Sequence, residues 1–191
     1  MVLPEVWLRG PVERIPALLQ PVAHSLLQCR EEVVKGLADL SPEEIFHQPA
    51  GVASVGFHVR HATGSLDRLL TYARGESLSP EQMAALRSEA EVDPSRDAAL
   101  TLIALFEAGV DRALDQLRAA DQSRLLEWRG VGRSQLPSTT LGLLFHAAEH
   151  TQRHIGQMVT TAKIVKAALG AQRTGTVNER VTTSPSRPSG P

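Results

Sequence analysis

The chain has 191 residues, of which 42% are hydrophobic and 21% charged, which is the composition of an ordinary globular domain and excludes a largely disordered chain. Lysine and arginine number 20 against 21 aspartates and glutamates, so the formal net charge is −1. Because this balance gives no general attraction to a nucleic-acid backbone, we expect no nucleic acid among the partners and look for a specific site instead.

The first predicted element is a long helix from about Ala17 to Leu40, in which apolar residues recur three and four positions apart. Pro21 should confine its regular part to the residues that follow. The segment "LSPEE" then places Ser41 as an N-cap, with a proline at the first helical position and Glu44 three residues after the cap. This pattern predicts a short helical turn.

The second and third long helices are predicted on either side of a polar linker. The second should begin near Ser54 and end before Gly75, and its apolar stripe must be buried. The linker "SLSPEQMAALRSEAEVDPSRD" has room for one short helix. The third long helix should run from about Ser95 to Ala119.

The last part of the chain holds one short extended piece, the fourth long helix and a tail. "RLLEWRGVG", residues 124–132, is the one segment that could pass for extended structure before a glycine turn. Ser138 is the predicted N-cap of a helix that continues to about Leu169, after which apolar residues are few. We therefore expect an all-α antiparallel four-helix bundle over residues 1–170 and a flexible tail over residues 171–191.

Five of the seven histidines fall on only two of these helices. On the fourth helix, "HAAEHTQRHIGQ" spaces His146, His150 and His154 four residues apart, which puts them on one ridge. On the second helix His58 and His61 are three apart. Two imidazoles at this helical spacing suit a divalent ion, although histidines at a helix surface or core edge are the ordinary alternative.

Helical geometry ranks these candidate ligands. It turns His154 inward, sets His150 beside the core and leaves His146 nearer to solvent. On the second helix the same geometry favours His58 over His61. Cys29 is a further candidate, but one thiol without a partner is more often a small buried hydrophobe, and it suits a reducing, cytoplasmic location.

Two motifs carry a family resemblance. "VGFHVRHATGSLDRLLTYARGE" and "HAAEHTQRHIGQM", with its H-x-x-x-H-x-G-Q pattern, resemble the corresponding segments of DinB-like proteins, and the match covers about residues 15 to 170. The resemblance implies a four-helix bundle with a divalent metal near one end. The positions that match the family motifs are His61, His150 and His154, which the resemblance implies as the metal ligands. His58 is kept as the alternative to His61 on the second helix, and His146 as a neighbour of the site.

The expected chemistry follows from that ligand set. Three imidazoles leave positions open on a metal ion, which lowers the pKa of bound water or activates a substrate thiolate. The resemblance implies a metal-dependent enzyme such as a thiol S-transferase, with a low-molecular-weight thiol as its small-molecule substrate. The alternatives are a metal-dependent hydrolase and a non-catalytic helical interaction module.

The resemblance also implies a homodimer. The metal it implies is a zinc or nickel ion, with iron or manganese as alternatives.

The first residues lack the basic and apolar segments of a signal peptide, and no stretch approaches the roughly 18 apolar residues of a membrane span. We therefore expect no membrane partner.

Overall fold

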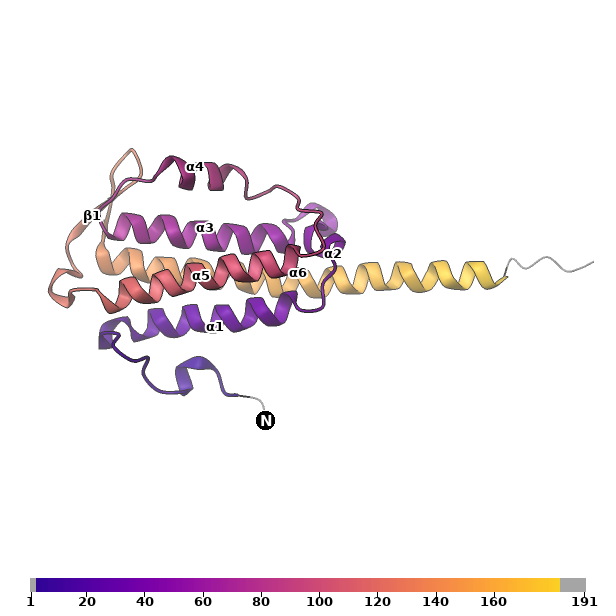
Figure 1. Cartoon of the computed structure of the whole chain (residues 1–191), viewed down its shortest axis with the longest axis horizontal. Coiled ribbons are helices and arrows are strands. Elements are labelled where there is room, and N and C mark those ends of the chain that lie inside the picture. Colours follow the sequence, from indigo (N-terminus) through magenta and orange to yellow (C-terminus); the bar gives the residue numbers. More distant parts are fainter. Residues whose placement is uncertain (1–2, 183–191) are drawn as a thin grey trace, which may run out of the picture.

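The computed structural model describes residues 3–182, with side chains over residues 3–169. This part of the chain is mostly helical, as predicted, with one small sheet. Four long helices lie side by side (Figure 1), namely α1 (Gln20–Leu37), α3 (Val55–Ala73), α5 (Ala98–Arg118) and α6 (Thr140–Thr182). Helices α1 and α3 each contact both α5 and α6, and the α3–α6 contact is the most extensive.

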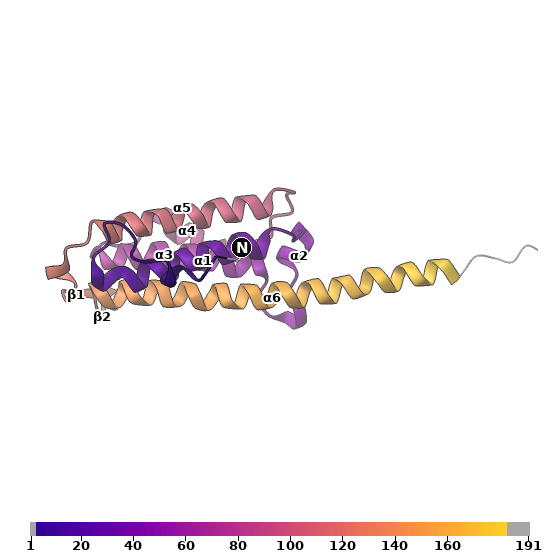
Figure 2. The same cartoon turned by 90° about the horizontal axis from the view of Figure 1, so that it is seen from below.

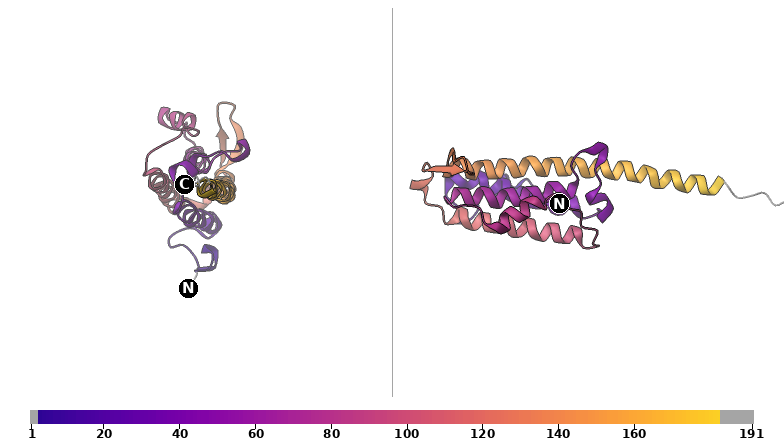
Figure 3. Two further views of the ribbon diagram at one scale, coloured as in Figure 1. Left: turned by 90° about the vertical axis from the view of Figure 1, so that its right-hand side faces the viewer. Right: turned by 90° about the horizontal axis from the view of Figure 1, so that it is seen from above.

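Two short helices connect the long ones, and both begin with a capping box. α2 (Pro42–Phe46) has the predicted box, in which Ser41 accepts from the backbone N–H of Glu44. α4 (Pro80–Arg87) falls in the polar linker. It lies outside the four long helices, against α3 (Figure 3). Short 3₁₀ turns complete the helical elements, at Val6–Leu8, Ala17–Leu19, Pro49–Gly51 and Gln122–Arg124.

The core lies where the apolar stripes of the long helices meet. Its largest fully buried side chains come from all four of them, and include Leu26, Leu66, Phe106, Leu144 and Ile155. Each such side chain contributes about 1.5–3 kcal/mol by leaving water. This packing fixes the rotation of α3 and α6 about their axes, and with it the side chains that face each other across their contact.

The helix starts follow the predictions with small shifts. α1 begins at Gln20, so Pro21 stands inside the first turn, where the missing N–H costs no helical hydrogen bond. The predicted start of α3 near Ser54 is confirmed, and the side chain of Ser54 caps the helix by accepting from the backbone N–H of Phe57. Gly75, with a φ of 81°, follows the end of that helix as predicted.

The predicted N-cap of the fourth helix is wrong by one residue. The strands β1 (Trp128–Val131) and β2 (Leu136–Thr139) form an antiparallel hairpin in which Ser138 pairs with Arg129. Pairing extends the backbone through Ser138, so the hydroxyl of Thr139 accepts from the N–H of Gly142 instead, at 3.0 Å. The predicted extended piece is thus the first strand of a hairpin.

Helix α6 continues to Thr182 rather than ending near Leu169, and it extends beyond the other helices (Figure 2). Once a helix is formed, each added residue gains a hydrogen bond without a new nucleation cost, which favours such an extension. Residues 183–191 of the predicted tail lie outside the described residues, and the division at residue 170 stays a prediction. No helix in the described range is long and apolar enough to cross a membrane.

Candidate metal site

Helices α3 and α6 bring three histidines together. His61, His150 and His154 are each half-buried, and each offers one ring nitrogen such that all three nitrogens lie within 4.8 Å of one another. The ring of His154 is centred 4.4 Å from that of His61 and 4.6 Å from that of His150. Within the described residues, no other group of histidines, cysteines and acids is placed to share a cation.

The spacing of the nitrogens fits a divalent ion. Nε2 of His61 and Nε2 of His150 are 3.0 Å apart. Two nitrogens that each lie about 2.0–2.1 Å from one zinc ion are roughly 3–3.5 Å apart at coordination angles between 90° and 110°. At this distance the pair either shares a proton in a hydrogen bond or directs two lone pairs at a common cation.

Burial favours the uncharged form of the two α6 histidines of the group. It lowers the pKa of His154 to about 4, and the positive charge that His61 and His150 would carry when protonated lowers it further. The pKa of His150 and that of His58 are also lowered, again mainly by burial. These imidazoles are therefore neutral at pH 7, which is the form that binds a metal ion.

The other nitrogens of these rings have different surroundings. Nδ1 of His61 lies 2.7 Å from a carboxylate oxygen of Glu89, and Nδ1 of His154 lies 3.3 Å from Nδ1 of His58. These contacts leave Nε2 of His61 and of His154 for a cation. Nδ1 of His150 is buried and has no hydrogen-bond partner among the described residues.

The remaining candidate ligands lie outside the group. His58 is the more buried histidine of α3, as its helical position predicted, but it contacts His154 from the side and is not one of the three. His146 is exposed beside Glu149, at 3.3 Å. Cys29 is buried with Sγ 3.3 Å from the side-chain oxygen of Gln152, and burial raises the pKa of its thiol to about 12.

Sequence reasoning missed Glu89, because it stands in the linker after α4, where no periodic pattern marks it. Three arginines close to these histidines contact acidic side chains or a backbone carbonyl. Arg68 forms a buried ion pair with Glu89, at 2.8 Å. Arg60 donates to the carbonyl of Glu91, and Arg153 pairs with Glu149.

A hollow of about 600 Å³ opens beside the cluster. His58 lines it, together with Arg153, Gln157 and Thr160 from the exposed side of α6 and several apolar side chains. Because the ring of His58 contacts that of His154, the hollow is separated from the three histidines by a single side chain.

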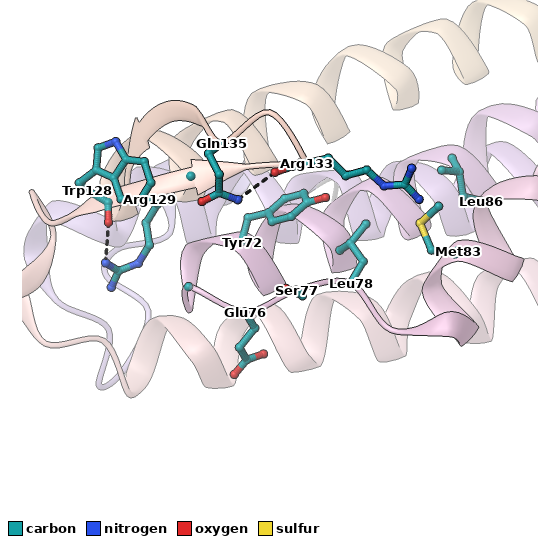
Figure 4. A pocket seen from close by; sticks show the side chains of 13 residues that line it. Tyr72, Glu76, Ser77, Leu78, Met83, Leu86, Trp128, Arg129, Arg133 and Gln135 are labelled. Carbon is teal, nitrogen blue, oxygen red and sulfur yellow. Dashed lines mark hydrogen bonds between the residues drawn. The ribbon is translucent and has the colours of Figure 1, made fainter.

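A larger hollow, of about 800 Å³, lies at the hairpin end of the helices (Figure 4). Tyr72, Trp128 and Arg133 line it, and no histidine or cysteine is among its thirteen lining residues. Tyr72 is three helical turns beyond His61 on α3, or about 16 Å. This hollow therefore supplies no ligand to the metal site.

Comparison with known proteins gives a family and two similar folds. The family model of the DinB superfamily matches residues 25–158. The structure is similar to that of a conserved protein from Enterococcus faecalis, with a TM-score of 0.64 and 19% identity over 78% of this chain and 97% of that one. A DinB-like protein from Bacillus cereus ATCC 10987 matches with a TM-score of 0.54 and 16% identity, over 76% of this chain and 91% of that one. Comparison with curated protein sequences gave no match.

Proposed function

The chain belongs to the DinB superfamily, and from this premise we propose that His61, His150 and His154 bind one divalent metal ion in a metal-dependent enzyme. The observation that carries the proposal is the approach of three ring nitrogens within 4.8 Å of one another, from two helices that are distant in sequence. The resemblance found in the sequence is confirmed at the level of the family.

The donor set favours particular metals. Imidazole nitrogen suits zinc and nickel, which we propose first, and also iron, while manganese prefers oxygen ligands and is the weakest of the four candidates. Three imidazoles bring no negative charge and leave coordination positions open. When bound, the ion supplies Lewis acidity, which holds a thiol substrate in its nucleophilic thiolate form.

The chain's own residues suit a small polar substrate. The hollow beside the cluster is lined by the guanidinium of Arg153 and the amide of Gln157, together with apolar side chains. These groups would hold a charged or amide-bearing part of the substrate. His58 stands between the hollow and His154, and its lowered pKa leaves it neutral and able to accept a proton from a group bound there.

We therefore propose a thiol S-transferase that uses a low-molecular-weight thiol. We further propose that the four long helices form the antiparallel bundle of the DinB-like type and that the protein works as a cytoplasmic homodimer. A metal-dependent hydrolase is the alternative enzyme, because open positions on an ion held by three histidines also suit activation of water. A non-catalytic dimeric helical module is the alternative outside enzymes.

Two measurements on protein purified without a polyhistidine tag test these proposals. Elemental analysis should find about one transition-metal ion per chain, and the loaded protein should accelerate conjugation of a small thiol to an electrophile. Loss of this activity on chelation, with recovery on adding the metal back, is the expected result. Hydrolysis without any thiol requirement would favour the hydrolase, while bound metal without turnover of either kind would favour the module.

A further inference from the structure

Glu89 has the environment of a residue that orients a metal ligand. Its side chain is buried, with 6% of the residue's surface exposed, although it stands in the turn after α4. One carboxylate oxygen lies 2.7 Å from Nδ1 of His61. Because a carboxylate only accepts hydrogen bonds, this contact requires the proton of the neutral imidazole to be on Nδ1. The lone pair is then on Nε2, the nitrogen that faces His150 at 3.0 Å.

The second carboxylate oxygen is held from the other side. It accepts a hydrogen bond from Nη1 of Arg68, at 2.8 Å, and Arg68 is itself buried. Gly64 makes room for this pair on the surface of α3. A Cβ at residue 64 would lie 2.7 Å from Nη1 of Arg68 and 2.8 Å from Oε1 of Glu89, which is closer than non-bonded contact allows. The carboxylate is thus fixed between a permanent cation and the imidazole.

We propose that Glu89 is a positioning residue for the metal site, which fixes the tautomer and the orientation of His61 and is itself fixed by Arg68. The proposal rests on the proposed function for the identity of the site. Metal-binding histidines generally donate their second ring N–H to a carboxylate or carbonyl, and loss of such a partner typically weakens metal binding 10–100-fold. Of the three histidines, His61 has this kind of partner, whereas Nδ1 of His150 has none in the part of the chain that the structure describes.

The first test needs no metal and is read from the wild-type protein. In metal-free wild-type protein labelled with ¹⁵N, the two ring nitrogens of His61 report which of them carries the proton. The Nδ1–H tautomer supports the proposal, and a predominantly Nε2–H ring overturns it. The His61 signals are assigned by their loss in His61→Ala.

The second test uses a matched pair of double variants. Glu89→Gln with Arg68→Met keeps an oxygen for His61 and removes the guanidinium that would otherwise face the amide group of the new glutamine. Glu89→Met with Arg68→Met has nearly the same shape but offers only a thioether, which is a weak acceptor. Both variants lose the ion pair, so a purely structural role for Glu89 would affect them alike.

Zinc affinity, measured by competition with a chromogenic chelator, separates the two roles. We expect the methionine double variant to bind zinc 10–100-fold more weakly than the glutamine double variant, and His61 to keep the Nδ1–H tautomer only in the latter. Equal affinities in two folded variants overturn the proposal. If circular dichroism shows the methionine variant unfolded, the tautomer in the wild type and in the glutamine variant decides.

A wrong role for Glu89 can be told apart from the absence of metal binding. A wild-type protein that binds none of zinc, nickel, iron and manganese contradicts the proposed function. The tautomer of His61 in that same metal-free protein still decides whether Glu89 orients the ring.

Discussion

Replacing His150 by alanine should weaken zinc binding strongly, whereas the same change at His146 should not. The two residues are one turn apart on α6, but only His150 belongs to the group whose nitrogens lie within 4.8 Å of one another. Its Nε2 is 3.0 Å from Nε2 of His61, whereas His146 is exposed and contacts Glu149. The matched pair therefore separates loss of a ligand from loss of a helical histidine.

The magnitude follows from the ligand count. Structural zinc sites with four ligands bind with about 10–16 kcal/mol, or roughly 2.5–4 kcal/mol per ligand. At about 1.4 kcal/mol for each factor of ten, losing one ligand costs roughly 60- to 700-fold in the dissociation constant. We expect His150→Ala to fall in this range and His146→Ala to stay within about threefold of the wild type, since it removes no ligand.

Competition with a chromogenic chelator at pH 7.5 measures both variants, with circular dichroism as the check on folding. Similar zinc affinities for His150→Ala and the wild type, in a folded protein, would refute the assignment of His150. An equal loss in both variants would show that binding depends on the exposed ridge of α6 and not on the buried group.

Three further predictions concern the scaffold. Cys29 should resist thiol reagents at pH 8 in the folded protein and react on unfolding, because burial raises the pKa of its thiol to about 12. The thiol of the unfolded chain ionises near pH 8.5, as is usual for cysteine, whereas the folded protein keeps it protonated. The free energy of unfolding should therefore fall as pH rises from about 8.5 towards 12, and a flat urea midpoint over that range would contradict this. Phe106→Ala should cost about 3–5 kcal/mol in urea unfolding, since Phe106 is fully buried, while Phe145→Ala, at a side chain 61% exposed, should cost less than about 0.5 kcal/mol. Ser54→Ala removes the cap of α3 and should cost about 1 kcal/mol in the same assay, and an unchanged midpoint would argue against the cap.

Much of the fold was predictable because local rules decide it. Apolar spacing located the four long helices, including the start of α3 near Ser54, and the cap at Ser41 was identified from residue types at fixed offsets. The N-cap at Ser138 was wrong because strand pairing, a non-local interaction, determines the backbone conformation there. The extension of α6 to Thr182 was missed because helix propagation needs no apolar stripe.

The site was predictable only in part, because it depends on how two helices face each other. Helical geometry ranked His58 above His61 by burial, and His58 is indeed the more buried. Which of them meets His150 depends on the rotation of α3 against α6, which the pattern of one helix does not contain. Only the family motif favoured His61. Glu89 arrives from a linker without any local signal, so tertiary structure alone reveals its contact with His61.

The central claim is that one cation is held jointly by α3 and α6. A crystal structure of the zinc-loaded protein, with anomalous scattering recorded on both sides of the zinc edge, tests it most directly. The account predicts a single zinc peak with ring nitrogens of His61, His150 and His154 at about 2.0–2.1 Å. A peak bound only by residues of α6, or one that takes His58 in place of His61, would contradict it.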